Sequence, residues 1–494
     1  MKPSILRPTA LAGFIALLPS LASPSPAAVH GWLEWRGQDQ TGTSRETHLP
    51  DKIDVKNALW VADFPGQSTP VIADGHLYIN GYLGDGPDLQ EYIGCFDAET
   101  GRQLWSHAFN DFLSDTIYLR YATSAPSVDE ETGNVYMQGT QGILACFTRD
   151  GKLLWQHSLM EEYGRLTFPN GRTASPVIDR ELVITRGITS SWGAHGPAGD
   201  RFYAFDKKTG ELAWSSAPGD RPQDNTFSQP WLDLWNGQRV LYSAGGDCTL
   251  VALNARTGEP LWRVPVAKAG AKGGINAAVI RYGDNLIVIH ESENLDSSEI
   301  GRMAAMKIPA SITKTNPLVP HIFTPKQLEQ WRNDVGSLAS SPVLVGDTIY
   351  EVNGTGDLCA VDAKSGRVLW KHKLGIEQRQ SSPFYADGKL YVAMYISALG
   401  ADKAAGSEAG TTGDLFVIKP GASGCEVLSQ TSLTGKCFGS PIAFNGKLYL
   451  QTDKKLYCFG KQGSSTHLAS ASNPPAWPAP GPKKSLMILP YEVV

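Results

Sequence analysis

Basic and amide side chains recur a few residues ahead of a repeated apolar strand, and these residue types can bind an anion or a hydroxyl-rich ligand. The set comprises Gln67, Arg120 with Tyr121, Arg172, Asn225, Asn276, Arg379 and Lys436. Guanidinium groups held close together repel one another unless an anionic or oxygen-rich group lies among them. That group can be a bound ligand, or it can be the polar neighbours of a purely structural channel. The sequence leaves both interpretations open.

A second candidate is an acidic stretch that carries Glu291, Glu293, Asp296 and Glu299, because carboxylates are the ligands that calcium prefers. The spacing matches no calcium-loop motif, so a solvated acidic loop is the simpler interpretation. The sequence contains no nucleophile elbow, zinc-protease motif, phosphate-binding loop or dinucleotide glycine motif. We therefore expect no catalytic residue and no metal ligand.

The seven cysteines form no CxxC, CxxCH or adjacent Cys-Cys pair. Three of them occupy a repeated strand position at which other copies of the strand carry alanine, which predicts buried thiols. These are Cys95, Cys146 and Cys458, against Ala204, Ala252, Ala305 and Ala360. Cys425 and Cys437 flank a connection between neighbouring repeat units, so a disulfide there is an alternative to two free thiols.

The elements that must position these residues belong to a repeat. Five segments end in a Trp placed four residues after a Gly: residues 96–105 (FDAETGRQLW), 147–155 (FTRDGKLLW), 205–214 (FDKKTGELAW), 253–262 (LNARTGEPLW) and 361–370 (VDAKSGRVLW). Gly permits a tight turn with positive φ between two strands, and the second strand then carries Trp at a fixed height. We expect Trp105, Trp155, Trp214, Trp262 and Trp370 to pack between neighbouring units.

A small residue followed by Pro and an apolar strand precedes each of these units. The prolines are Pro70, Pro126, Pro176, Pro230, Pro342, Pro383 and Pro441, and an eighth copy without Pro lies at residues 276–280 (NAAVI). Asp-Gly or Asn-Gly follows several copies and predicts a hairpin. Eight units of four short antiparallel strands predict an all-β, eight-bladed β-propeller.

The last unit lacks a fourth strand, whereas Leu59 and Trp60 stand before the first unit with no unit of their own. We expect this N-terminal strand to pair with the last blade. The ring would then be closed between the two ends of the chain, and Trp60 would take the place of the missing Trp.

The motif Ala-x-Asp-x-x-Thr-Gly-x-x-x-Trp resembles the repeat of the PQQ-like (quinoprotein-type) β-propeller family, which includes quinoprotein alcohol dehydrogenases and the outer-membrane assembly lipoprotein BamB. The opening WRGQDQTG at residues 35–42 also resembles the start of many exported PQQ-like repeat proteins. The resemblance covers roughly residues 32–460 and implies the fold more specifically than the activity. Classical quinoprotein alcohol dehydrogenases carry a vicinal disulfide beside the quinone, and this sequence has no adjacent cysteines.

Alternating strand direction places the short turns on one face of such a ring and the longer links on the other. We call these the short-turn face and the long-loop face, and we expect residues 308–338 among the long links. Because loops carry function, we predict that Gln67, Arg120, Tyr121, Arg172, Asn225, Asn276 and Arg379 bind a protein partner or a small polar ligand on the long-loop face, over the central channel.

Residues 1–27 carry Lys2 and Arg7, an apolar run at 9–18 and small residues before Ala22 and Ala27, which predicts a cleavable signal peptide. We expect residues 28–460 to form the propeller and the Pro-, Ser- and Ala-rich residues 461–494 to form a tail. The formal net charge of −5 and the lack of basic runs argue against nucleic acid. We expect a periplasmic or secreted monomer without a membrane span.

Three functions fit these observations. The leading one is a non-catalytic binding or scaffold module for a partner protein or a small polar or anionic ligand, with no cofactor. The second is a PQQ-dependent alcohol or sugar oxidoreductase with PQQ and calcium, although we match no catalytic Asp or calcium ligand to it. The third is a BamB-like outer-membrane assembly factor, against which the absence of a cysteine before Cys95 counts.

Overall fold

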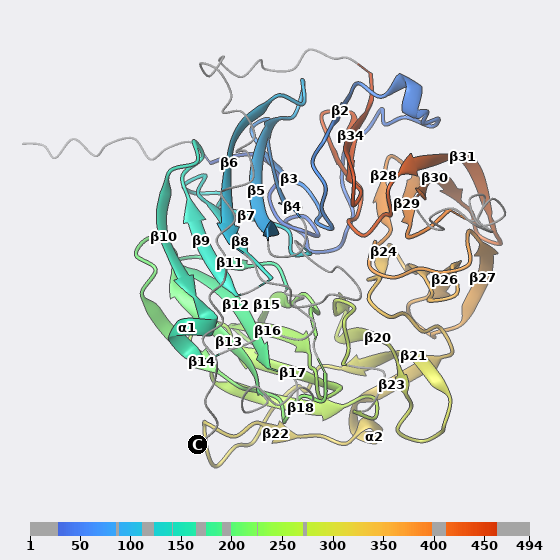
Figure 1. The fold of residues 1–494 in the computed structure, drawn as a ribbon. Coiled ribbons are helices and arrows are strands. Elements are labelled where there is room, and N and C mark those ends of the chain that lie inside the picture. Colours follow the sequence, from blue (N-terminus) through green and yellow to red (C-terminus); the bar gives the residue numbers. More distant parts are fainter. Residues whose placement is uncertain are drawn as a thin grey trace, which may run out of the picture.

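The computed structural model describes residues 28–84, 88–110, 123–140, 142–164, 174–189, 199–224, 226–269, 274–397 and 412–461. These residues form eight sheets arranged in a ring (Figure 1), each with four antiparallel strands, so the predicted eight-bladed propeller is confirmed. We number the blades 1 to 8 in the chain order of their innermost strands. Each blade has four strands, and the sheets of blades 1 and 4 each include one additional strand.

The first two strands of every blade form a hairpin nearest the axis. The innermost strands are β3 (Val71–Ala73), β7 (Ser127–Val128), β11 (Val177–Asp179), β15 (Trp231–Trp235), β19 (Ile280–Tyr282), β24 (Val343–Val345), β28 (Phe384–Ala386) and β32 (Ile442–Phe444). The second strands are β4 (His76–Leu83), β8 (Val135–Gln138), β12 (Leu182–Thr189), β16 (Gln238–Ala244), β20 (Asn285–Glu293), β25 (Thr348–Val352), β29 (Lys389–Met394) and β33 (Lys447–Gln451).

The other two strands lie farther from the axis. The third strands are β5 (Gln90–Asp97), β9 (Ile143–Phe147), β13 (Gly199–Asp206), β17 (Thr249–Asn254), β21 (Ile300–Lys307), β26 (Asp357–Asp362), β30 (Thr412–Pro420) and β34 (Leu456–Gly460). The outer strands are β6 (Gln103–Asn110), β10 (Leu153–Ser158), β14 (Leu212–Ser216), β18 (Pro260–Pro265), β23 (Glu329–Asn333), β27 (Val368–Lys373), β31 (Cys425–Thr434) and β2 (Trp60–Ala62). The helical pieces are η1 (Val55–Asn57), α1 (Leu159–Tyr163) and α2 (Pro325–Leu328).

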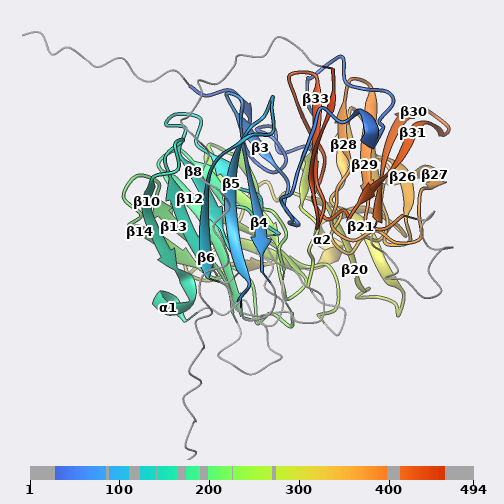
Figure 2. The ribbon, with the colours of Figure 1, turned by 45° about the horizontal axis from the view of Figure 1, so that its top comes forward.

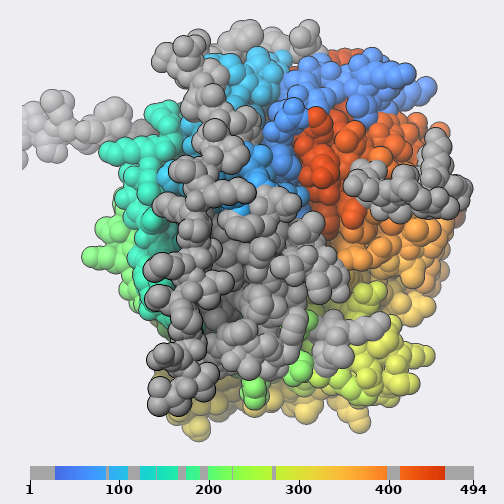
Figure 3. Space-filling model, in the orientation of Figure 1, coloured from blue at the N-terminus to red at the C-terminus, as the bar shows by residue number. Residues whose placement is uncertain are grey.

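The ring closes between the two ends of the chain, as predicted. Strand β2 is the outer strand of blade 8, where Trp60 faces Cys458 and Ala62 faces Leu456. The blue N-terminal surface and the red C-terminal surface therefore lie side by side in the space-filling view (Figure 3). A further strand, β1 (Gly31–Trp32), pairs with the inner edge of β3 in blade 1.

The small residue before each Pro joins neighbouring blades. Its N–H donates to the side-chain oxygen of the equivalent residue in the next blade, so that Ser341 N–H bonds Ser382, Ser382 N–H bonds Ser440, and Ser440 N–H bonds Thr69, each at 2.9 Å. The last bond crosses the closure from blade 8 to blade 1. The repeated Ser-Pro pattern thus provides a set of buried hydrogen bonds around the axis, a role that the sequence alone did not indicate.

The repeated tryptophans lie on outer strands and face the next blade. The indole N–H of Trp105 donates to Arg149 O (2.9 Å), that of Trp370 to Gly421 O (2.9 Å) and that of Trp60 to Ala98 O (3.0 Å). Gly101 has a φ of 71°, and a Cβ there would lie 2.5 Å from the Trp60 ring. Both the positive φ and the close approach of Trp60 therefore require Gly at this turn. Trp155 packs in the same way against Gly210, and Trp214 against Gly258.

Blade 5 departs from the repeat. Its Trp is Trp331, which faces Ala305 and donates to Ala363 O (3.0 Å) of blade 6. Residues 308–328 intervene between the third and fourth strands, and their strand β22 (His321–Ile322) pairs in parallel with β18 of blade 4, whose Trp262 faces His321. The prediction of residues 308–338 as a link on the long-loop face was wrong, because no Gly marks the turn four residues before Trp331.

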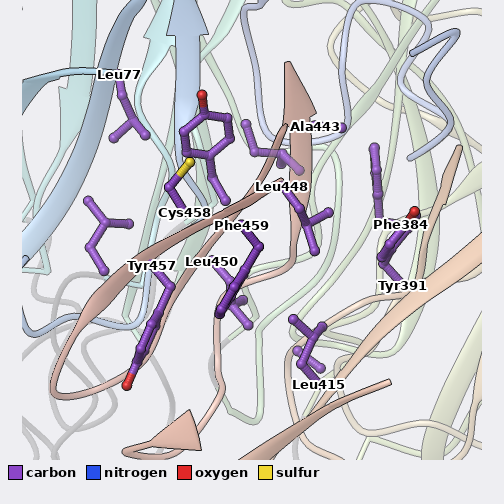
Figure 4. Close-up of a cluster of buried hydrophobic side chains, with 14 of the residues drawn as sticks. Leu77, Phe384, Tyr391, Leu415, Ala443, Leu448, Leu450, Tyr457, Cys458 and Phe459 are labelled. Carbon is purple, nitrogen blue, oxygen red and sulfur yellow. The ribbon is translucent and has the colours of Figure 1, made fainter. Parts of the chain in front are cut away.

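Buried apolar side chains fill the spaces between blades. Around the closure they come from blades 1, 7 and 8, including Leu77, Tyr391, Leu448 and Tyr457 (Figure 4). The aligned thiols behave as predicted, since Cys95, Cys146 and Cys458 are buried and face Trp105, Trp155 and Trp60.

The alternative of a disulfide between Cys425 and Cys437 is wrong, since both are free thiols. Cys425 begins the ten-residue strand β31 and Cys437 follows the end of that strand. An extended strand rises about 3.3 Å per residue, so the two cysteines lie far beyond disulfide reach. The segment between them is the outer strand of blade 7, not a short connection.

Candidate functional site

The residues just ahead of the innermost strands surround the axis on the long-loop side. They line a pocket of about 40 Å³ to which every blade contributes: Gln67, Thr69, Thr123, Ala174, Ser175, Phe227, Gln229, Asn276, Ala339, Gln380 and Phe438, with Trp35. Gln67 and Asn276 thus lie where the sequence placed them, and both are buried. A volume of this size holds a few water molecules at most.

Arg379 directly precedes Gln380, which lines this pocket. Its Nε donates to Glu377 Oε1 (2.6 Å), and its guanidinium lies 4.8 Å from the centre of the Tyr395 ring. The ammonium group of Lys436 lies 5.6 Å from the same ring. Two of the predicted cations therefore share one aromatic side chain. Arg120, Tyr121, Arg172 and Asn225 lie outside the described residues, so the predicted set as a whole stays a prediction.

The N-terminal residues 28–46, which we call the channel segment, occupy the channel from the short-turn side. Strand β1 lies on β3, and the carbonyl oxygen of Leu33 accepts from Val128 N–H (2.8 Å) of blade 2. Figure 2 shows the two faces: α1, which lies in a link of the long-loop face, is at the lower end of the blades, and the dark blue N-terminal residues are at the upper end. The resemblance of residues 35–42 to exported propellers thus falls on residues that fill the axis.

A charged cluster lies within the channel, and the sequence did not indicate it. Arg36 donates to the carbonyl oxygens of Ser341 (3.1 Å) and Pro342 in blade 6 and of Thr41 (2.8 Å). Burial raises the pKa of Glu351 to about 8, although the hydroxyls of Ser340 and Ser337 and the Arg36 guanidinium oppose the shift. Burial also raises the pKa of Glu34 to about 8.

Two hollows flank the channel segment on the short-turn face. The first, which we call the Glu34 cleft, has a volume of about 610 Å³. Its walls come from the channel segment and from blades 2, 3 and 4, with Leu33, Val128, Val177, Ile178 and Leu232 as apolar members and Glu34, Asp129, Glu130, Glu131, Arg180, Lys207 and Arg239 as charged members. The second hollow, of about 670 Å³, lies between the channel segment and blade 8 near Ala443 and Phe444.

A quinone and its calcium ion, which the PQQ-like resemblance implies, do not fit the described residues at the axis. Ligand pockets are typically about 300–1,000 Å³, whereas the pocket on the long-loop side is about 40 Å³. Trp35 and Arg36 of this chain occupy the channel beneath it. Among the residues that the structure describes, no group of three or more His, Cys, Asp or Glu side chains is placed to hold a metal ion.

Within the described parts of the chain, no helix has the length and apolar character needed to cross a bilayer.

Fold and site together define an eight-bladed β-propeller with PQQ-like repeats whose axis is filled by its own N-terminal residues. The chain matches the family described as "Outer membrane protein assembly factor BamB" over residues 53–194, 90–318 and 323–409, and it belongs to that family.

Relatives carry two kinds of name. An outer membrane protein assembly factor BamB from Yersinia pestis is 22% identical over 353 residues, which are 70% of this chain and 75% of the relative. A BamB from Burkholderia pseudomallei is 28% identical over 163 residues, about a third of either chain. A quinohemoprotein alcohol dehydrogenase from Comamonas testosteroni is 24% identical over 190 residues, only a quarter of that enzyme.

Solved structures show the same fold. BamB from Moraxella catarrhalis has a TM-score of 0.55 at 15% identity and covers 82% of this chain with 99% of its own. The Comamonas testosteroni quinohemoprotein alcohol dehydrogenase has a TM-score of 0.56 at 14% identity and covers 90% of this chain with 82% of its own. Because both identities are low, these likenesses support the fold alone.

Proposed function

We propose that the chain is an exported propeller that binds a partner protein and catalyses no reaction itself. Membership of the BamB family supports a binding role, because relatives over most of the chain are named as outer membrane protein assembly factors. In its specific form, the proposal is that this chain, like those relatives, is one component of a protein assembly at a membrane.

The observation that carries the proposal is the filled axis. A propeller enzyme needs an enclosed space at the axis for its reacting groups, but here Trp35 and Arg36 lie in that space and bond the blades. The surfaces that remain for recognition are the two faces of the ring. Surfaces of that extent suit a protein partner better than a small substrate.

Photo-crosslinking in the native cell envelope tests the proposal. A crosslinking amino acid at exposed Ile376 probes the long-loop face, and one at exposed Gln38 probes the short-turn face. Exposed Leu154 on an outer strand is the matched control. We expect one discrete adduct, identified by mass spectrometry, from one face. Absence of any adduct from either face would overturn the proposal.

The quinone-dependent oxidoreductase remains the second candidate, because one relative is named as a quinohemoprotein alcohol dehydrogenase. An absorbance spectrum of the protein isolated from its native envelope distinguishes the two. A quinone band that survives gel filtration would favour the enzyme, and it would require the channel segment to take another position.

Export and processing are part of the proposal. We propose that residues 1–27 direct the chain out of the cytoplasm and are removed, and that the chain then acts in the periplasm or outside the cell. N-terminal sequencing of the mature protein tests this, and we expect its first residue to follow Ala22 or Ala27.

A further inference from the structure

The backbone of each innermost strand has an edge that faces the channel. In an antiparallel hairpin, alternate residues direct their N–H and C=O toward the partner strand, and the residues between them direct these groups away. In this chain the second residue after the repeated Pro directs its N–H and C=O away from the blade. Leu232 shows it, because its N–H and C=O bond the side chain of Gln40, and Tyr385 bonds Gly42 and Ser44 in the same way.

The channel segment pairs with this edge in several blades. It covers Ile72 of blade 1 with β1, Val128 of blade 2 with Leu33, Leu232 of blade 4 with Gln40, and Tyr385 of blade 7 with residues 42–44. Addition of an extended segment to an inner edge is therefore something that this channel already accommodates. These contacts are the pattern of strand addition seen in peptide recognition.

Blade 3 lacks such a cover. Strand β11 pairs with β12 through Val177, Ile178 and Asp179, and Asp179 closes the hairpin opposite Leu182. Ile178 is the second residue after Pro176, so its N–H and C=O face the channel, and among the described residues no hydrogen bond links them to the channel segment. Ile178 also lines the Glu34 cleft, which lies against this edge and has a volume of about 610 Å³.

Among the described residues, three charged side chains of the cleft form no ion pair: the acidic Glu34 and Glu130 and the basic Arg180. The unpaired charge of the cleft is therefore acidic in balance. Lys207 pairs with Asp129 and Glu131, each at 2.9 Å, and Arg239 pairs with buried Asp179 at 2.7 Å. Glu34 has no ion-pair partner within the described parts of the chain, and burial without a compensating charge raises its pKa to about 8. A cationic side chain that entered the cleft would lie beside this carboxyl group and favour its charged form.

We infer that the Glu34 cleft binds an extended segment of a partner protein, which adds to β11 at Ile178 and places a Lys or Arg side chain beside Glu34. The inference rests on the proposed function and names the surface and the chemistry of the partner. The apolar walls at Leu33, Val128 and Leu232 would hold the flanking side chains of the segment. The second hollow lies against Ala443, but its charged residues already have partners. Exposed Asp39 and Arg45 pair at 3.9 Å, and the Glu46 carboxylate accepts from the N–H groups of Asn445 and Gly446 at 3.0 Å each.

The backbone contact is tested with a defined probe: a fluorescein-labelled, N-acetylated peptide of alternating Val and Thr with one central Lys. Ile178→Pro removes the N–H that faces the channel, and Pro is tolerated at a strand edge where that N–H bonds no neighbour. Ile178→Ala is the matched control, because it shortens the side chain and keeps the N–H. We expect the peptide to bind Ile178→Pro at least tenfold more weakly than Ile178→Ala, although the two variants should have equal melting temperatures. Equal affinities, or no binding of the peptide to the wild-type protein at millimolar concentration, would overturn the inference.

If Ile178→Pro does not fold, hydrogen exchange of the wild-type protein answers the same question. Protection of the Ile178 amide on addition of the peptide supports strand addition, and unchanged exchange overturns it.

The preference for a cationic side chain is tested with a second peptide that carries Glu in place of Lys. We expect the Lys peptide to bind at least fivefold more tightly, and we expect Glu34→Gln to abolish that preference while Glu161→Gln, on α1 at the opposite face, preserves it. Equal binding of the two peptides would remove Glu34 from the site.

Two further outcomes separate this inference from the proposed function. If the crosslinked partner is still captured by Ile178→Pro, the chain binds a partner elsewhere and the cleft inference falls alone. If the wild-type chain captures no partner, the proposed function fails.

Residues 462–494 of this chain could occupy the cleft in place of a partner, so the hydrogen-exchange measurement is repeated on a chain that ends at residue 461. Protection of Ile178 in the full chain that is lost on truncation would assign the cleft to the chain itself and overturn the inference.

Discussion

The side-chain amide of Gln40 forms two hydrogen bonds with the backbone of Leu232, accepting from its N–H at 2.7 Å and donating to its C=O at 2.8 Å. These residues are 192 positions apart in the sequence. A side-chain amide here imitates a neighbouring strand, because it offers a donor and an acceptor to the edge of β15. The N-terminal residues thus act as a partner for the inner edges of the blades, in addition to filling the channel.

Gln40→Ala should expose that edge. Two hydrogen bonds are lost and the Leu232 backbone loses both partners, so we expect local stability to fall by about 1–3 kcal/mol. Hydrogen exchange resolved to the Leu232 amide measures the effect directly. Gln38→Ala is the control, since Gln38 is exposed and belongs to the same segment. Unchanged exchange at Leu232 would mean that the amide contributes nothing to holding the segment in the channel.

Trp331→Ala should destabilise the whole propeller although sequence comparison within the chain does not identify it. The Trp331 ring packs on Gly366 of the next blade and its N–H bonds Ala363. Loss of a large aromatic at such a contact typically costs about 3–5 kcal/mol. Chemical denaturation measures it, with exposed Leu154→Ala on another outer strand as the control. A loss no larger than that of the control would contradict a docking role for these tryptophans.

Ser382→Ala tests the hydrogen bonds that join the blades around the axis. The substitution removes the oxygen that accepts from Ser341 N–H, and this donor is buried between blades 6 and 7. A buried N–H without a partner costs about 1–3 kcal/mol. We expect that loss in the free energy of unfolding, whereas exposed Ser215→Ala should change it by less than about 0.5 kcal/mol. Two equal values would show that water replaces the serine.

Sequence reasoning reached the fold because each blade repeats its own signals. The Gly-to-Trp spacing locates five outer strands, the repeated Pro locates seven inner strands, and the orphan Trp60 locates the closing strand, all without reference to distant contacts. The outer strand of blade 5 was missed, because it follows an insertion and its Trp331 has no Gly at the usual distance.

The site was harder to predict than the fold, because it depends on how non-repeated residues cross the ring. Gln67 and Asn276 were placed correctly at the axis by their position ahead of a strand. The position of Glu34 in the cleft and the open edge at Ile178 depend on the path of the channel segment, which carries no periodic pattern. The motif at residues 35–42 was a signal of family membership, but its residue types do not reveal which blades they touch.

The buried carboxyl group of Glu351 should make stability depend on pH. Its side chain is fully buried, and burial raises its pKa from an ordinary 4.5 to about 8 in the folded chain. The folded state therefore holds a proton that the unfolded state has lost between these two values. Stability from this group is complete below about pH 4.5 and is lost as pH rises through about 8, at up to about 1.4 kcal/mol for each pH unit.

Glu351→Gln removes this dependence, because the amide is neutral at every pH and nearly the same size. We expect the variant and the wild-type protein to differ by a constant amount below pH 4.5, and the variant to gain relative stability steadily up to about pH 8. Denaturation at pH 4, 6 and 8 measures the difference, and subtraction removes the titration of groups that the two proteins share. Exposed Glu161→Gln is the control. A difference that does not change with pH would show that Glu351 has the same pKa in the folded and unfolded chain, so that Arg36 and the hydroxyls of Ser337 and Ser340 offset the effect of burial.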